Sequence, residues 1–135
     1  MNILFFLTPK AVCAHVRSDD TVRQALERME ATSYAALPIL ARDGTYCGTL
    51  TEGDLLWAIK NLCNMEQKKM ESTGIMDISR RRDNVPVRVD TKVEDILSTA
   101  LEQNFVPVVD DRNVFIGIIT RKAIMKYCLD HLLKQ

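Results

Sequence analysis

The chain has 135 residues, 47% of them hydrophobic and 27% charged, which is enough for one globular domain or for two small halves that share a core. The 18 Lys and Arg residues balance the 18 Asp and Glu residues, so no overall positive field attracts nucleic acid or an anionic membrane. We therefore expect no nucleic acid and no membrane among the partners.

The four cysteines are spread along the chain without a Cys-x-x-Cys pair, at Cys13, Cys47, Cys63 and Cys128. The two histidines, His15 and His131, are isolated as well. Because a zinc site needs clustered ligands, this spacing predicts no metal site. It favours reduced thiols in the core of a cytoplasmic protein.

The chain starts with an apolar run, Met1 to Leu7, which Thr8-Pro9-Lys10 ends. No basic residue precedes this run, and its seven residues are too few for a signal peptide or a membrane span. We interpret residues 1–10 as an arm, a short helix or an extended segment, that packs on the body of the protein.

Residues 11–64 have the pattern of a β-α-β-β-α unit. A short extended piece around Ala14 to Arg17 precedes a helix, which Asp20 or Thr21 can cap. Apolar residues recur along this helix at the i, i+3, i+4, i+7 spacing of one buried face. They are Val22, Ala25, Leu26 and Met29.

Two strands and a second helix complete this unit. The apolar strand 36–40 contains Pro38, which lacks a backbone donor, so we expect the strand to be edge-like or irregular there. A turn at Arg42-Asp43-Gly44 leads to a strand from Tyr46 to Leu50, and the last helix starts after Thr51. The apolar face of that helix is formed by Leu55, Leu56 and Ile59.

Residues 65–84 are rich in Lys, Glu, Ser and Arg, and we expect an exposed linker with a helical turn near Ile75-Met76. The run Arg80-Arg81-Arg82 is interpreted first as a solvated face of this linker. The alternative is an arm that reaches a phosphate or a partner.

Residues 85–135 repeat the first unit. Pro38 and Pro107 are 69 positions apart, as are Gly48 and Gly117, and the helix positions match at an offset of 71. In this copy Asp90 or Thr91 can cap the first helix. A second strand runs from Val114 to Ile119, and a last helix starts after Thr120, with its apolar face formed by Ile124, Tyr127 and Cys128.

Shared spacing across three segments indicates an internal repeat. Neither copy has enough apolar surface to close a core alone, so we expect the two to pack together. The sequence therefore predicts an α/β (α+β) fold of two β-α-β-β-α repeats, at residues 11–64 and 85–135, related by a pseudo-twofold axis and without a transmembrane segment.

The stretch Gly48 to Asp54 joins a strand end to a helix start. The free N–H groups and the positive dipole of a helix N-terminus suit phosphate, and a carboxylate at Asp54 can accept both hydroxyls of a ribose. The alternative is that Thr51 and Asp54 only cap the helix. For this segment alone, capping is the better interpretation.

The two-fold repetition, the apolar-Pro-apolar strands and the Gly-apolar-x-Thr-x-x-Asp stretch together resemble tandem CBS domains, also called a Bateman module. The resemblance covers Ala11 to Leu129, with Thr49 after Gly48 as a small departure. It implies two clefts for a regulatory nucleotide. Each cleft takes its base pocket from the early strands of one repeat and its Thr and Asp from the last strand-helix junction of the other.

The first implied cleft resembles a site for AMP, ADP, ATP or adenosine. It joins Thr51 and Asp54 to a base pocket around Val87, Val106 and Pro107.

The second implied cleft joins Thr120 to the base pocket of the first repeat. This pocket lies around Lys10, Val12, Ala14, Ala36 and Pro38. Ala123 replaces the Asp of the pattern, so ribose recognition by a carboxylate is lost here. Arg121 and Lys122 either bind a phosphate-rich ligand or face solvent, and both interpretations stay open.

The second half is also similar to stand-alone bacterial CBS proteins that bind cyclic di-AMP, which carry Thr followed by two basic residues and lack the Asp. Cyclic di-AMP is therefore the alternative ligand, for a receptor that acts through a protein partner.

We expect no enzyme, because no Gly-x-Ser-x-Gly, His-Glu-x-x-His or Walker A motif is present. We also expect no cofactor apart from the regulatory nucleotide. An interaction module with empty clefts is a third interpretation, but the presence of Thr51 and Asp54 argues against it.

The expected partners are a regulated protein that the sequence does not name and a second copy of the chain. The homodimer is expected to bury the last helices near Leu56, Ile59, Ile124 and Cys128.

Overall fold

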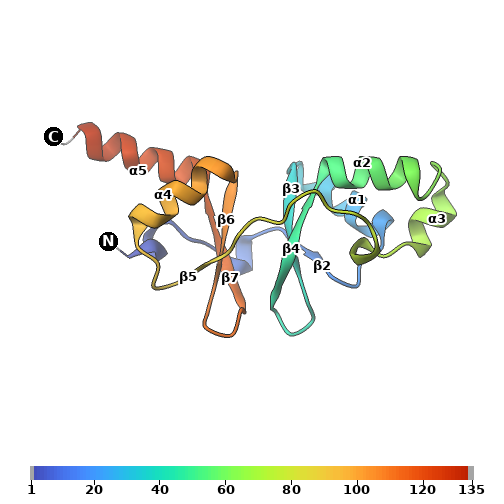
Figure 1. Cartoon of the computed structure of the whole chain (residues 1–135), viewed down its shortest axis with the longest axis horizontal. Coiled ribbons are helices and arrows are strands. Elements are labelled where there is room, and N and C mark those ends of the chain that lie inside the picture. Colours follow the sequence, from blue (N-terminus) through green and yellow to red (C-terminus); the bar gives the residue numbers. More distant parts are fainter. Residues whose placement is uncertain (1, 134–135) are drawn as a thin grey trace. The chain divides into compact units, whose positions relative to one another are not determined.

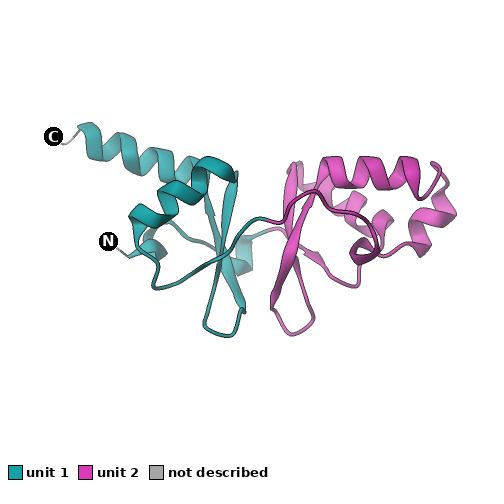
Figure 2. Cartoon of the chain, in the orientation of Figure 1, with its two compact units in different colours: residues 1–13, 84–135 teal, residues 14–83 magenta. Residues whose placement is uncertain are grey.

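The computed structural model describes residues 2–133, and the chain divides into two compact units. Unit 2 is the continuous segment Ala14–Asp83 (Figure 2). Unit 1 combines the residues up to Cys13 with those from Asn84 onwards. One unit is therefore built from a single stretch of chain and the other from two.

Unit 2 contains the elements expected for the first repeat (Figure 1). In chain order they are β2 (Val16–Arg17), α1 (Val22–Thr32), β3 (Ala36–Leu40), β4 (Tyr46–Thr51) and α2 (Glu52–Asn61), followed by α3 (Gln67–Ser72) and a short 3-10 helix, η3 (Ile75–Asp77). The strands form one sheet in the order β2-β3-β4, with β2 parallel and β4 antiparallel to β3.

Unit 1 contains the same series for the second repeat, preceded by the N-terminal segment. Its elements are η1 (Ile3–Phe6), β1 (Thr8–Pro9), η2 (Lys10–Val12), β5 (Val87–Arg88), α4 (Val93–Glu102), β6 (Phe105–Val109), β7 (Phe115–Thr120) and α5 (Arg121–Leu133). The sheet order is β1-β7-β6-β5. The predicted mixed α and β fold with two β-α-β-β-α repeats is confirmed, and Thr51 and Thr120 lie at equivalent strand-to-helix junctions.

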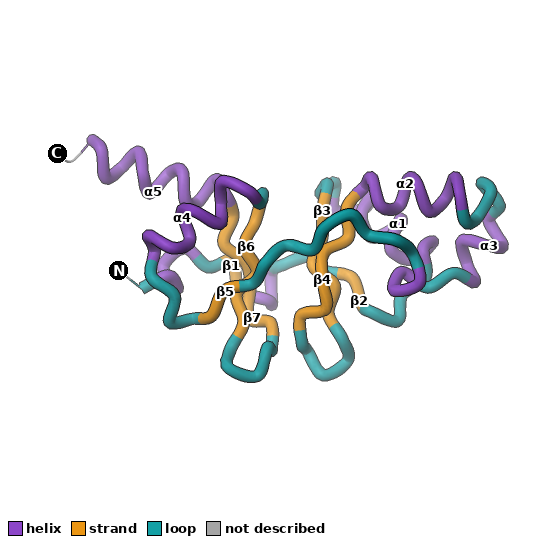
Figure 3. Tube along the Cα trace, viewed as in Figure 1, coloured by secondary structure: helices purple, strands orange, loops and turns teal. Residues whose placement is uncertain are grey.

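In each unit two α-helices pack over one face of the sheet, α1 and α2 in unit 2 and α4 and α5 in unit 1 (Figure 3). In unit 2 the helical face predicted from the i, i+3, i+4, i+7 spacing supplies Val22, Ala25 and Met29 to the core, where they meet β3 and β4 residues. In unit 1, Val93, Ile96 and Ala100 of α4 take the same part. Leu26 is the exception, since it remains 36% exposed and is not part of the core.

The proline strands are central in their sheets, and the expectation of an edge-like or irregular strand is confirmed locally, at the prolines. The irregularity is confirmed, because the register shifts after Ile39 and after Val108. The parallel neighbour β2 pairs only with Ile39 and Leu40, and Pro38 lies just before them. Pro38 therefore has a paired strand on one side only, which is why a missing N–H is tolerated in a central strand. Pro107 has the same position relative to β5.

The helix starts differ between the repeats. Thr21 caps α1 as expected, in a capping box in which its side chain accepts from the Gln24 N–H. The caps expected at Asp90 or Thr91 are wrong: the N-cap residue of α4 is Lys92, and it makes no side-chain capping bond. The N-cap lies two residues after Asp90 and one residue after Thr91, so neither side chain is in the capping position.

Residues 65–84 are not exposed throughout, which corrects the expectation of a solvated linker. Ile75 lies in η3, where the helical turn was expected, and together with Ile78 it is buried in the core of unit 2. In unit 1 the arm behaves similarly: Ile3 is buried in the core, and Thr8–Pro9 pairs with β7. Each repeat is thus preceded by a segment that packs in the unit of the other repeat.

Among the described residues, all four cysteines are free thiols, and burial raises the pKa of Cys13 to about 11. The described helices include none with the length and apolarity needed to cross a membrane.

Candidate functional site

The end of β4 and the start of α2 form the first strand-to-helix junction. Thr51 is the N-cap: its Oγ1 accepts a hydrogen bond from the Asp54 N–H at 3.1 Å, and its own N–H donates to Asp54 Oδ2 at 3.0 Å. Two backbone donors that a helix start leaves unpaired are satisfied in this way. The capping alternative considered for this segment is therefore present.

Asp54 is buried, with 2% of its surface exposed, and both of its carboxylate oxygens accept backbone hydrogen bonds. The second donor is the Arg81 N–H, 3.1 Å from Oδ1. This contact links the junction to residues 80–83, of which Arg81, Arg82 and Asp83 are themselves exposed. A ligand that uses Oδ1 of Asp54 must share it with, or take it from, the Arg81 N–H.

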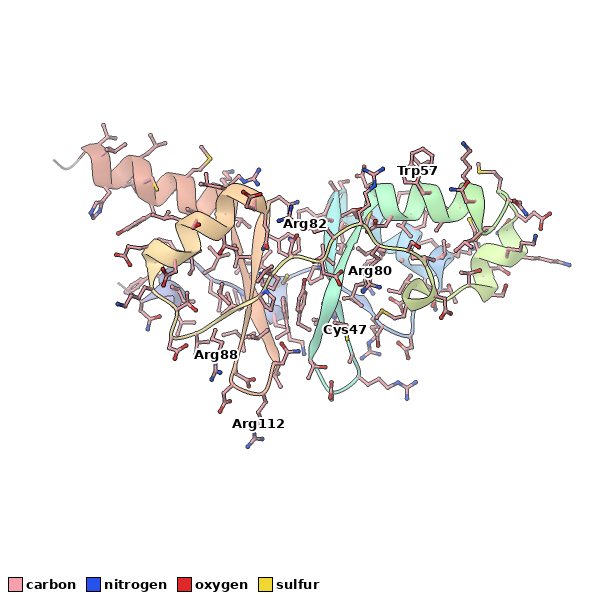
Figure 4. All side chains as sticks on the ribbon, in the orientation of Figure 1. Cys47, Trp57, Arg80, Arg82, Arg88 and Arg112 are labelled. Atoms are coloured by element: carbon pink, nitrogen blue, oxygen red, sulfur yellow. The ribbon has the colours of Figure 1, made fainter. Side chains whose placement is uncertain are left out.

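Arg80, labelled in Figure 4, forms an ion pair with Asp83, which itself contacts β4 at Thr49. Asp83 Oδ1 accepts from Arg80 Nε at 3.0 Å and from the Thr49 N–H at 2.9 Å, and Oδ2 accepts from Arg80 Nη2 at 3.2 Å. Partial burial raises the pKa of Asp83, but the Arg80 guanidinium and the Thr49 N–H outweigh it and hold this pKa below its usual value. The sequence signalled this cluster only through the three consecutive arginines.

Gly48 makes the approach of Asp83 to β4 feasible. A Cβ atom built on Gly48 would lie 2.6 Å from Asp83 Oδ1, and the backbone there has a φ of +150°, which side chains rarely adopt. A glycine at this position is therefore required by the carboxylate that rests on the strand.

Tyr46 supports the strand beside this cluster. Its hydroxyl lies 2.6 Å from Thr49 Oγ1 in a buried contact. Burial raises the pKa of Tyr46 to about 12, with a smaller opposing effect of the Thr49 hydrogen bond, so the phenol is neutral at physiological pH.

The second junction, in unit 1, has the same cap without the carboxylate. Thr120 Oγ1 accepts from the Ala123 N–H at 3.1 Å, as Thr51 does from Asp54. Arg121 is exposed, and its Nε donates to the Ala100 carbonyl near the end of α4 at 3.0 Å. The guanidinium is thus anchored at a helix end, next to the exposed Lys122.

The N-terminal segment lies over β7 as residues 80–83 lie over β4. A Cβ atom on Gly117 would lie 2.3 Å from the Thr8 carbonyl oxygen and 2.8 Å from Leu7 Cδ1. The two glycines of the repeat therefore serve one purpose, which is the close passage of a segment that precedes the other repeat.

The remaining residues predicted for the clefts are divided between the units. Unit 2 holds Ala14, Ala36 and Pro38; unit 1 holds Lys10, Val12, Val87, Val106 and Pro107. Ala36 lies opposite Thr51 in the register of β3 and β4, so these two are brought together. Val106 is fully buried in the core of unit 1, which leaves only its backbone to face a ligand, whereas Val12 is exposed. Because each predicted cleft draws on both units, the clefts remain predictions.

Across the part of the chain that the structure describes, no group of three or more His, Cys, Asp and Glu side chains is placed to hold a metal ion. The first junction accordingly combines backbone donors, the buried Asp54 and the Arg80 guanidinium, and the second combines a helix start with Arg121. Such an arrangement can bind hydroxyl and phosphate groups.

The family of the chain follows from a comparison with protein-family models. The model described as CBS domain matches residues 7–61 and 75–130. The chain belongs to the CBS-domain family, with two CBS domains in tandem, and the resemblance stated from the sequence is confirmed. The second match starts at Ile75, so it includes the segment that packs in unit 2.

Two curated relatives differ in how much of them the chain spans. Inosine-5'-monophosphate dehydrogenase of Methanocaldococcus jannaschii is 31% identical over 111 residues, which are 82% of this chain and only 21% of that enzyme. Cyclic di-AMP receptor B of Bacillus subtilis is 27% identical over 124 residues, which are 88% of this chain and 80% of the receptor.

Solved structures of small CBS proteins share the fold. CBSX2, solved in complex with AMP, is 26% identical with a TM-score of 0.76, and the match covers 99% of this chain and 98% of CBSX2. The CbpB protein of Listeria monocytogenes, solved in complex with c-di-AMP, is 22% identical with a TM-score of 0.85, covering 98% of each chain. At 22% identity the second likeness concerns the fold alone.

Proposed function

We propose that this chain is a regulatory module that binds an adenine nucleotide, namely AMP, ADP, ATP or adenosine, and that it catalyses no reaction itself. The observation that carries the proposal is the junction of β4 and α2, where Thr51 and the buried Asp54 stand at the start of a helix in a CBS repeat. The AMP complex of the related CBSX2 supports the choice of nucleotide.

In the first proposed cleft, Asp54 recognises the ribose and Thr51 lies beside the phosphate. A carboxylate can accept hydrogen bonds from both hydroxyls of a ribose diol. The backbone N–H groups of the helix start are donors and cannot take this part. The base is proposed to lie against the strands of the second repeat, around Val87, Val106 and Pro107, with the buried Val106 contributing through its backbone.

In the second proposed cleft, phosphate recognition replaces ribose recognition. Thr120 with Arg121 and Lys122 supplies a hydroxyl and two cations, and Ala123 supplies no carboxylate. The base pocket of this cleft is proposed at Lys10, Val12, Ala14, Ala36 and Pro38. The anchoring of Arg121 Nε at the Ala100 carbonyl orients the guanidinium without consuming its charge.

Cyclic di-AMP is the second candidate ligand. It is favoured by the likeness to cyclic di-AMP receptor B, which extends over 88% of this chain. It is also favoured by the second junction, where two basic residues follow Thr120 and the ribose-binding carboxylate is absent. The module would then act through a protein partner.

The test is to release the ligand from the purified protein for mass spectrometry, and then to titrate the protein by calorimetry with AMP, ATP and cyclic di-AMP. GMP serves as the control for base recognition. We expect an adenine compound to bind more tightly than GMP. Equal affinity for GMP and AMP would contradict adenine recognition, and no binding of any nucleotide would contradict the proposed function.

Arg121→Ala tests the second cleft. Arg112→Ala is the matched control, because it removes an arginine from the turn between β6 and β7, away from the proposed cleft residues. We expect Arg121→Ala to weaken ATP or cyclic di-AMP binding much more than adenosine binding, and the loss to diminish as salt rises. Unchanged affinity for every phosphate-bearing ligand would leave only the first cleft in the proposal.

We further propose a cytoplasmic homodimer that pairs through the last helices of the repeats. Leu56 is 58% exposed and Ile59 is partly buried, so both are accessible on α2. Of the residues expected in this interface, Ile124 is instead buried in the core of unit 1, because its position on the first turn of α5 faces the sheet. The large apolar residues that α5 leaves at the surface are Met125, Leu129, Leu132 and Leu133.

A further inference from the structure

Residues 80–83 form a strap, as we name this segment, that is attached to the first junction at two points. At one point the Arg81 N–H donates to Asp54 Oδ1, and at the other Asp83 accepts from the Thr49 N–H. Arg80 starts the strap, with its side chain 15% exposed, and pairs with Asp83 at the other end. These contacts all lie within unit 2, so they belong to one packed body.

The carboxylate of Asp83 is bound as a small anionic ligand would be bound. It is held by one backbone N–H and two guanidinium N–H groups, at 2.9–3.2 Å. Guanidinium and backbone N–H groups are also the donors that recognise phosphate. The space for this anion exists because Gly48 has no side chain, which would otherwise clash with the carboxylate.

We propose that Asp83 is an internal competitor of the ligand's phosphate at this junction, and that Arg80 binds that phosphate once Asp83 is displaced. The inference rests on the proposed function, since it names a further residue and a regulatory step for the same site. For the run Arg80-Arg81-Arg82, the proposal favours the second interpretation, an arm that reaches a phosphate, and assigns that contact to Arg80.

Release of the strap also changes Asp54. The same four residues carry the Arg81 N–H that occupies Asp54 Oδ1, so displacement of Asp83 loosens both attachments. A free Oδ1 can then accept a ribose hydroxyl. Phosphate binding at Arg80 and ribose binding at Asp54 are therefore coupled, because both require the strap to open, and the shared opening step is a source of positive cooperativity.

Two substitutions separate the roles of the ion pair. Asp83→Asn removes the internal anion and should tighten AMP binding by roughly two- to fivefold, the range expected from an ion pair of this exposure. Arg80→Gln also opens the strap, but it removes the guanidinium that is proposed to bind the phosphate. The ratio of AMP affinity to adenosine affinity should therefore fall. Asp19→Asn and Arg42→Gln are the matched controls, because Asp19 and Arg42 form an ion pair in the same unit away from the junction.

Hydrogen exchange of the chain without nucleotide adds a readout that does not depend on the ligand. In Asp83→Asn the amides of Thr49 and Arg81 should exchange faster. The Ala41 amide, which donates to the Thr45 carbonyl in the β3–β4 hairpin, should stay unchanged. Faster exchange at all three amides would indicate general loosening of unit 2. It would overturn the proposal that Asp83 specifically holds the strap on the junction.

Calorimetry of the same proteins distinguishes the two proposals. Suppose that the unsubstituted chain binds AMP, that Asp83→Asn does not bind it more tightly, and that Arg80→Gln leaves the ratio of AMP to adenosine affinity unchanged. The proposal that Asp83 competes with the phosphate is then overturned, while the proposed function stands. If neither the unsubstituted chain nor the control variants bind any adenine nucleotide, the proposed function itself is overturned.

Discussion

Asp54 has two roles that make opposite demands on its carboxylate. It completes the capping box of α2, and it accepts a hydrogen bond from the strap, so the fold already uses both oxygens. A buried acceptor that serves two backbone donors is expensive to remove, because the donors are left without partners. The residue proposed to recognise ribose is therefore also a structural residue.

The first prediction concerns this double role. Asp54→Ala should lower the free energy of unfolding by about 1–3 kcal/mol and should also weaken adenosine binding at least about tenfold. Urea denaturation and calorimetry measure the two effects. Glu52→Ala, an exposed acidic substitution in the same helical turn, is the control and should change both only slightly. Full stability of Asp54→Ala would contradict the assigned contacts.

The second prediction concerns Asp83 and pH. The pKa of Asp83 in the folded chain is lower than in the unfolded chain, where an Asp titrates at about 3.9. A carboxyl group shifted in this direction stabilises the fold fully above its unfolded pKa, and the stabilisation is lost as the pH falls through the folded pKa.

The stability difference between the unsubstituted chain and Asp83→Asn should accordingly be constant between about pH 5 and 7 and should shrink below about pH 4. Urea denaturation over this pH range measures it. A difference that does not change with pH would show that the charge of Asp83 makes no contribution.

At the scale of the elements, most of what periodicity can encode was predictable. The helical face of Val22, Ala25 and Met29, the two junction threonines and the proline strand 36–40 all depend on local spacing, and the structure has them. The strands β4 and β7 each end one residue later than predicted. The central position of the proline strands was not predictable in this way. It depends on how far β2 and β5 extend alongside them, and each is only two residues long.

The contacts of the candidate site were predictable only in part, for a related reason. Side-chain types signalled Thr51 and Asp54, but the donors that occupy Asp54 and Asp83 include backbone N–H groups, which leave no mark in a sequence. That residues 80–83 lie over β4 depends on tertiary packing of Ile75 and Ile78, not on the local pattern of charges.

The third prediction concerns the uncapped start of α4. Lys92 supplies no side-chain acceptor at the N-cap and places a positive charge at the positive end of the helix dipole. Lys92→Ser should therefore raise the free energy of unfolding by about 0.5–2 kcal/mol. Thr21→Ala is the mirror-image control, since it removes an existing capping box on α1 and should lower stability by about 1 kcal/mol. A destabilising Lys92→Ser would contradict the cap assignment.

At the scale of the whole molecule, the fourth prediction tests the proposed homodimer. Sedimentation velocity should show a dimer at micromolar concentrations, and Leu56→Asp should shift it towards monomer, because a charge would be buried without a partner in the interface. Met65→Asp is the control: Met65 is 70% exposed on the loop after α2 and has a positive φ, which Asp tolerates. A monomer at high micromolar concentration would end the proposal.

The two-part construction of unit 1 has a consequence for biosynthesis. Residues 14–83 can close their unit as soon as they have left the ribosome, but the segment from Ile3 to Leu7 has to wait for β7, whose Gly117 pairs with Pro9. At translation rates of about 5–20 residues per second this wait lasts roughly 5–20 s. During that time Ile3, Phe6 and Leu7, which pack in or against the core of unit 1 in the folded chain, are unprotected, and such transiently exposed apolar surface is what chaperones bind.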